Sequence, residues 1–173
     1  KGGQAIRFPV IEIVAVEDQS PLRHCRTHLN EIDIAIFIST NAVEKALPTL
    51  LESGNLPTHL QLIGVGKRTV ETLTTRGLPA LCPPPPYNSA AVLTMPQLQP
   101  VTVQNKRIVI FRGEGGRELL AETLQQRRAK TTYVNVYQRR QPPVPNGLND
   151  QLPVDIIIVT SGEGLQNLFT MLK

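Results

Sequence analysis

The sequence predicts an α/β fold built on doubly wound, flavodoxin-like parallel sheets. Two observations predict it. Short apolar runs alternate with helix-like segments along most of the chain, which is typical of a mostly parallel sheet with helices on both faces. In addition, residues 33–43 and 155–165 look like two copies of one strand-to-helix unit.

Each copy begins with an aspartate, continues with an apolar run, and reaches a serine six positions later, Ser39 or Ser161. An apolar run that ends in Ser or Thr before a helix indicates a buried parallel strand followed by an N-capped helix. That arrangement presents hydroxyl groups and unpaired backbone N–H groups beyond the carboxyl end of the strand. We therefore expect two related α/β units whose serines face one cleft.

The remaining elements follow from apolar periodicity and from Gly and Pro boundaries. We expect an extended segment at 10–16, helices at 18–31, 42–53, 67–76, 89–95 and 117–128, and strands at 59–65, 78–82, 107–111 and 131–136. A polar, proline-rich connector follows at 138–147. The simplest organisation is a complete domain at 17–137, bracketed by a partial domain formed by 1–16 and 138–173. The two chain crossings between them would lie near 10–14 and 134–140.

Composition narrows the class of protein. The chain has no apolar run long enough to span a membrane and no secretory signal. Its two cysteines, Cys25 and Cys82, are too few for a disulfide scaffold, which favours a reducing cytoplasm. Aromatic residues make up 4% of the chain, so stacking platforms for single-stranded nucleic acid are scarce. The net charge of +4 suits a small anionic ligand at least as well as nucleic acid, and we expect no nucleic-acid partner.

Two glycine-rich turns open predicted helices, but neither completes a nucleotide-binding motif. In the loop 112–117, Gly113 and Gly115 fit a dinucleotide fingerprint, but the third glycine position is Glu118 and the acidic residue expected ~20 positions later is missing. The turn around Gly64 and Gly66 fails the phosphate-loop pattern at residues 61 and 68. Both turns remain either anion-binding helix starts or plain structural turns.

Other catalytic patterns are weaker. His24 and His28, with Cys25 beside them, could suggest a metal site, because positions i and i+4 share a helix face. No further ligands occur at suitable spacing, so we expect a solvated helix surface and no metal site. Tyr137 lies where the last strand of the block meets the connector. A phenol is a plausible proton donor there, and an amphipathic tyrosine at a domain edge is the alternative.

Taken together, the motifs resemble those of the uroporphyrinogen-III synthase family. The segments that carry the resemblance occur in the family's order along nearly the whole chain: 8–12, 37–43, 63–69, 88–89, 112–120, 136–139 and 159–163. Family members extend further at both ends, so the outer of two α/β domains, joined by a two-stranded linker, is expected to be incomplete here.

The resemblance implies an enzyme that cyclises hydroxymethylbilane, a linear tetrapyrrole rich in carboxylates, with loss of water and inversion of the last ring. It implies no metal or organic cofactor, and we expect a monomer. Tyr137 would be the acid that protonates the departing hydroxide. The residues expected to bind substrate are Ser39, Thr69, Arg112, Gly113, Arg117, Ser161 and Gly162. The alternatives are an anionic-metabolite-binding or regulatory module without catalysis and, less favoured, a nucleotide-dependent enzyme.

Overall fold

The computed structural model describes residues 4–52, 54–116, 118–144 and 154–172. These residues divide into two compact units, one formed by 15–138 and the other by 1–14 with 139–173. The boundaries fall inside the first and last strands, β1 (Glu12–Ala15) and β5 (Lys130–Arg140), so each of these strands belongs partly to both units. Each unit is described below by itself.

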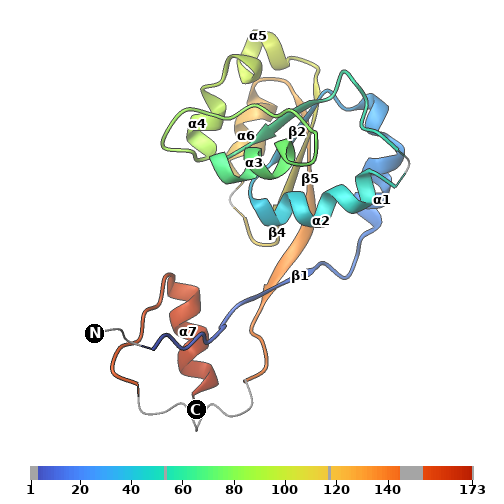
Figure 1. Ribbon diagram of the computed structural model, residues 1–173. Helices are drawn as coiled ribbons and strands as arrows, with labels where there is room; N and C mark the ends of the chain where they lie inside the picture. Colours follow the sequence, from blue (N-terminus) through green and yellow to red (C-terminus); the bar gives the residue numbers. More distant parts are fainter. Residues whose placement is uncertain (1–3, 53, 117, 145–153, 173) are drawn as a thin grey trace. The chain divides into compact units, whose positions relative to one another are not determined.

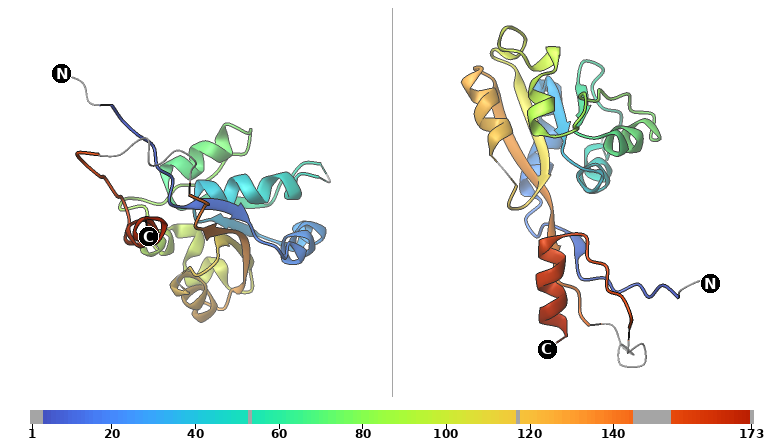
Figure 2. Two further views of the ribbon diagram at one scale, coloured as in Figure 1. Left: turned by 90° about the horizontal axis from the view of Figure 1, so that it is seen from below. Right: turned by 90° about the vertical axis from the view of Figure 1, so that its left-hand side faces the viewer.

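The larger unit is an α/β sandwich, with helices on both faces of one sheet (Figures 1 and 2). The sheet has the order β1-β5-β4-β2-β3, and the pairs β2–β3, β2–β4 and β4–β5 are parallel. The remaining strands are β2 (Ile34–Phe37), β3 (Gln61–Gly64) and β4 (Arg107–Gly113). The helices are α1 (Ser20–Thr27), α2 (Thr40–Leu50), α3 (Lys67–Thr74), α4 (Ser89–Leu93), α5 (Pro100–Val103) and α6 (Leu119–Gln126), with short 3-10 turns at Leu29–Glu31 and Pro96–Leu98.

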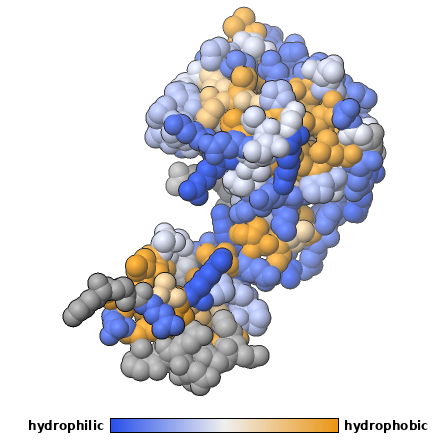
Figure 3. Space-filling view, viewed as in Figure 1, coloured by the Kyte–Doolittle hydropathy of each residue, from blue (hydrophilic) through white to orange (hydrophobic). Residues whose placement is uncertain are grey.

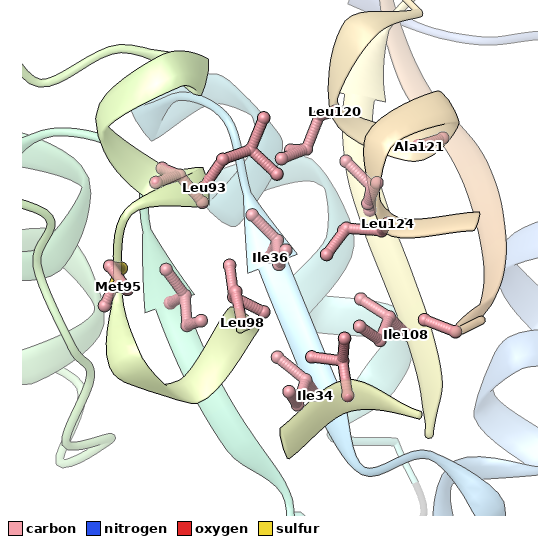
Figure 4. Close-up of a cluster of buried hydrophobic side chains, with 14 of the residues drawn as sticks. Ile34, Ile36, Leu93, Met95, Leu98, Ile108, Leu120, Ala121 and Leu124 are labelled. Atoms are coloured by element: carbon pink, nitrogen blue, oxygen red, sulfur yellow. The ribbon is translucent and has the colours of Figure 1, made fainter. Parts of the chain in front are cut away.

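One face of the sheet packs against α4, α5 and α6 through an aliphatic core (Figure 4). Because side chains alternate along a strand, Ile34 and Ile36 point to this face, and Leu98 and Leu124 cover them from the helix side. All four are less than a twentieth exposed. All four residues of β2 are apolar because the strand is buried on both of its faces.

The opposite face uses the alternate residues of the same strands. Phe37 of β2 and Phe111 of β4 stack with their ring centroids 4.8 Å apart, and both are fully buried. Helix α2 covers this face with a row of small and aliphatic side chains: Ala42, Val43, Ala46, Leu47 and Leu50. The expected alternation of strands and helices is therefore confirmed as a mixed α/β fold.

A charged contact joins the amino ends of β2 and β4. Asp33 accepts a hydrogen bond from Lys106 Nζ at 2.7 Å and another from the backbone N–H of Arg107 at 2.8 Å. Partial burial alone would raise the pKa of Asp33, but the two hydrogen bonds outweigh it and the pKa lies below its usual value of 3.8. This contact fixes the register of neighbouring strands at the end of the sheet away from the candidate site.

The smaller unit contains helix α7 (Gly162–Met171), which buries Leu168 and Met171. The side chain of Asn167 donates a hydrogen bond to the carbonyl of Val10 at 2.8 Å and so ties the helix to the first segment of the chain. Several apolar side chains of this unit remain exposed, and Figure 3 shows hydrophobic surface there: Ile156, Ile157, Ile158, Leu165, Phe169 and Leu172.

Two expected strands differ in the structure. Residues 156–159, predicted as a buried strand, form none, and Ile156 and Ile158 are 80% and 85% exposed. No described neighbour supplies the backbone hydrogen bonds that an apolar strand needs. Residues 78–82 form a single parallel bridge, between Leu81 and Ile63, because prolines at 79 and 83 limit the available N–H donors.

Candidate functional site

The strand order of the larger unit reverses between β2 and β4. From β2 the chain moves outward to β3 on one side, and β4 and β5 then fill the other side. In open α/β sheets, ligands bind beyond the carboxyl ends of the strands at such a reversal, because the flanking loops diverge there. Ser39 follows β2 at this point, and Gly113 is the last residue of β4.

Ser39 and Tyr137 meet at this reversal although they are far apart in the sequence. The Ser39 hydroxyl accepts a hydrogen bond from the backbone N–H of Ala42 at 3.2 Å, which caps α2. The same hydroxyl donates to the phenol oxygen of Tyr137, also at 3.2 Å. The helix cap therefore orients a hydroxyl toward the phenol. Tyr137 itself is only 2% exposed, so its ring position is determined by packing.

Gly113 provides the space that the ring of Tyr137 occupies. A Cβ atom at residue 113 would lie 2.5 Å from Cε2 and 2.6 Å from Cζ of Tyr137. The β4–β5 register shifts at this point: Arg112 pairs with Asn135, and Gly113 pairs with Tyr137. The resulting bulge brings the tyrosine over the glycine, and the backbone N–H of Glu114 donates to the carbonyl of Tyr137 at 3.0 Å.

The side chain of Arg112 is engaged within its own loop. The guanidinium donates to Asn135 Oδ1 at 3.1 Å, to the carbonyl of Gly116 at 3.3 Å and to Glu118 at 2.8 Å. It also lies 3.5 Å from the ring centroid of Tyr133, a cation–π distance. Arg112 is 9% exposed, so these contacts hold the glycine loop in shape.

Thr69 lies in the first turn of α3, which begins after the short loop that follows β3. It is 4% exposed, and its hydroxyl makes no hydrogen bond with any residue that the structure describes. The chain turns tightly before it, since a Cβ at Gly64 would lie 2.9 Å from the backbone nitrogen of Val70. Gly66, by contrast, has nothing within 4 Å of its Cβ position, which leaves the start of α3 open.

In the smaller unit, Ser161 has the same local geometry as Ser39. Its hydroxyl accepts a hydrogen bond from the backbone N–H of Gly164 at 3.0 Å and caps α7. Gly162 begins the helix with open space at its Cβ position. The capped helix start is thus present in both copies of the repeated segment, whereas only the first copy contains the strand.

The predicted residues are therefore distributed unevenly. Ser39, Gly113 and Tyr137 come together at the strand reversal, and Thr69 follows the neighbouring strand. Ser161 and Gly162 belong to the other unit, and Arg117 lies outside the described residues. The sequence did not predict the Ser39–Tyr137 hydrogen bond, because nothing in either local segment specifies a partner 98 positions away.

A cavity of about 280 Å³ lies at the opposite, amino ends of β4 and β5, beside α1. Its lining includes His24, Cys25 and His28 and none of the predicted site residues. Burial raises the pKa of the Cys25 thiol to about 12, so this thiol stays protonated at neutral pH. Within residues 4–52, 54–116, 118–144 and 154–172, no three His, Cys, Asp or Glu side chains gather as metal ligands. Among the helices described, none is both long and apolar enough to cross a membrane.

Comparison with known proteins identifies the family. A family model described as uroporphyrinogen-III synthase HemD matches residues 1–173. A uroporphyrinogen-III synthase of Salmonella typhimurium (strain LT2) is 34% identical over 177 residues, covering 98% of this chain and 71% of the relative. One from Escherichia coli (strain K12) is 32% identical, covering 99% and 71%.

The fold agrees with a solved structure. The crystal structure of uroporphyrinogen-III synthetase from Helicobacter pylori 26695 matches with a TM-score of 0.59 and 16% identity, covering 95% of this chain and 70% of that one. At this identity the match concerns the fold alone. The family model over residues 1–173 and the two relatives above 30% identity show that the chain belongs to the uroporphyrinogen-III synthase family.

Proposed function

We propose that this protein cyclises hydroxymethylbilane to uroporphyrinogen III, with loss of water and inversion of the last ring. Within that reaction, the observation that carries our assignment is the phenol of Tyr137, hydrogen-bonded to Ser39 at the strand reversal. The reaction must protonate a departing hydroxide. A phenol is protonated at neutral pH and can supply that proton.

In this proposal the Tyr137 phenol donates its proton to the hydroxyl group of the bilane as the C–O bond breaks. Water leaves as the electron pair of the pyrrole nitrogen forms a protonated azafulvene, which a carbon of the last pyrrole ring then attacks. The proton released when ring closure restores the aromatic pyrrole returns to the Tyr137 phenolate. The Ser39 hydroxyl donates to the phenol oxygen, where negative charge develops during the transfer. The helix cap holds Ser39 in place, so little reorganisation is needed at that moment.

Substrate carboxylates would be bound by backbone N–H groups at the starts of α2 and α3 and in the loop after β4. Thr69 supports this assignment because its hydroxyl makes no hydrogen bond with any described residue and so is available to a ligand. We assign Gly113 and Arg112 to shaping the loop that meets the substrate. We retain Arg117, Ser161 and Gly162 as further binding residues on the strength of the family pattern.

We further propose that residues 1–14 and 139–173 are part of a second α/β domain, joined to the first through β1 and β5. The chemistry requires only a proton donor and a coiled substrate conformation, so we propose that no metal or organic cofactor takes part. The protein is proposed to act as a cytoplasmic monomer whose only partner is the tetrapyrrole. Gel filtration tests the oligomeric state.

The decisive experiment incubates the purified protein with hydroxymethylbilane and separates the oxidised products into type I and type III isomers. We expect type III; formation of type I alone at the uncatalysed rate would refute the function. Tight binding of the bilane without type III formation would instead indicate a binding module without catalysis.

The acid role is tested separately. Tyr137→Phe is expected to lower the rate of type III formation by about 10²–10⁴-fold, the usual contribution of a general acid. Tyr133→Phe is the matched control, because its hydroxyl instead contacts Ala121 and Glu118 at the start of α6. Full activity of Tyr137→Phe would remove the acid role while leaving the overall function standing.

A further inference from the structure

Lys67 places a positive charge at the carboxyl edge of the sheet. It is the first residue of α3, directly after the open Gly66 turn, and its side chain is exposed. It forms no ion pair with any described residue. Arg112, the cation near the end of β4, is paired with Glu118 and enclosed by its loop. Lys67 is therefore available to a ligand where Arg112 is not.

The side chain of Lys67 is held in place by Tyr87. Its ammonium nitrogen lies 5.4 Å from the centroid of the Tyr87 ring, within the range of a cation–π contact. The pKa of Lys67 is raised, first by a side-chain hydrogen bond with Tyr87 and then by smaller electrostatic contributions that include Cys82 and Glu71. The lysine thus remains fully charged and is restrained on one side, which lowers the entropy lost when it pairs with an anion.

The backbone of Tyr87 supports a positioning role. Its φ is +56°, a left-handed conformation that is unfavourable for a residue with a Cβ atom. Asn88, the next residue, caps α4 by accepting a hydrogen bond from the backbone N–H of Ala91 at 2.9 Å. The unfavourable turn directly before this cap places the half-buried Tyr87 ring against Lys67.

We propose that Lys67, held by Tyr87, binds a carboxylate of the tetrapyrrole beside the unpartnered hydroxyl of Thr69. The inference rests on the proposed function, since it assigns a residue to substrate binding in that same reaction. A charge-assisted hydrogen bond at this position contributes to binding in both the ground state and the transition state. Its loss should therefore raise KM and leave kcat nearly unchanged.

Steady-state kinetics of type III formation tests this assignment. Lys67→Met is expected to raise KM for hydroxymethylbilane about tenfold while kcat changes less than about twofold, with a weaker dependence of KM on salt. Tyr87→Phe should raise KM by a smaller factor, because the ring remains and only the hydroxyl is lost. Lys130→Met removes an exposed lysine at the amino end of β5 and should leave KM unchanged.

Arg68→Met tests whether the effect of Lys67 comes from a specific contact with the substrate or from the net positive charge at the start of α3. Arg68 is the next residue of α3, is exposed, and has no described side-chain partner. An equal rise in KM for Arg68→Met and Lys67→Met would assign the effect to the net charge of the helix start and overturn the inference. An unchanged KM in Lys67→Met, with the wild-type protein still forming type III, would overturn it as well. Failure of the wild type to form type III refutes the proposed function instead.

Cys82 offers a readout that does not depend on turnover. It is exposed and directly follows Leu81, which bridges to Ile63 near the end of β3, the strand that leads to Lys67. Uroporphyrinogen III, added anaerobically as the probe, should slow alkylation of Cys82 by iodoacetamide in the wild type. In Lys67→Met, about ten times more uroporphyrinogen III should be needed for the same protection, because its affinity should fall by the factor by which KM rises. Equal protection in the wild type and in Lys67→Met would place the carboxylate elsewhere and overturn the inference.

Discussion

Replacement of Gly113 by alanine should displace Tyr137. Carbon atoms in contact prefer a separation of about 3.5–4.0 Å, so a Cβ lying 2.5 Å from Cε2 and 2.6 Å from Cζ must be relieved by a movement of about 1 Å. The ring is buried and cannot swing into solvent. A shift of that size also breaks the 3.2 Å hydrogen bond to Ser39. We expect a loss of about 1–3 kcal/mol from overpacking, with the hydrogen bond contributing within that range.

Urea denaturation of a double-mutant cycle measures this effect. Gly113→Ala should destabilise the protein when Tyr137 is present and have almost no effect when Tyr137→Ala has removed the ring, giving a coupling of about 1–3 kcal/mol. Gly162→Ala, where the added methyl group meets nothing, is the control and should be neutral or slightly stabilising. An equal cost of Gly113→Ala in both backgrounds would refute the steric argument, because the damage would then arise elsewhere.

Three further outcomes are expected. Ser39→Ala and Ser161→Ala each remove a helix cap, and each should cost about 0.5–2 kcal/mol in urea denaturation. Only Ser39→Ala should also lower kcat for type III formation, through its contact with Tyr137, whereas Ser161→Ala, at a proposed binding residue, should act on KM. Equal losses of kcat in the two variants would contradict this. Thr69→Val keeps the side-chain shape and removes a hydroxyl that has no described partner, so the stability should be unchanged or slightly increased. The KM for hydroxymethylbilane should rise. A marked fall in melting temperature would show that the hydroxyl has a structural partner. After brief alkylation of the native protein at pH 8, mass spectrometry should find Cys82 modified and Cys25 unmodified, because Cys25 is buried and its pKa is about 12. Cys25 should react only after unfolding. Rapid labelling of both cysteines in the native protein would rule out the buried position of Cys25.

The elements of the larger unit were largely predictable because their signals are local. The apolar run before Ser39 predicts β2, the serine predicts the start of α2, and Gly77 predicts the end of α3. In the structure Gly77 adopts a φ of +74°, a conformation that glycine takes readily and that ends the helix. Each of these features depends on residues within one turn of the element.

The arrangement of the site was less predictable because it depends on strand order. Tyr137 reaches Ser39 only because β4 lies between their strands and carries Gly113 where the ring passes. The engagement of Arg112 by Glu118 and Asn135 likewise depends on the β4–β5 register. For residues 156–159, an apolar composition alone predicted a strand, but a strand forms only where another one pairs with it.

The division of the chain also determines the order in which its parts can fold during synthesis. The larger unit is one continuous segment, 15–138, whereas the smaller unit needs both 1–14 and 139–173. A ribosome therefore releases every residue of the larger unit before it has made the second part of the smaller one. Domains generally fold as units while synthesis proceeds. Residues 4–14 must accordingly wait for partners that are synthesised after the larger unit, and until then their apolar side chains are exposed to chaperones and proteases.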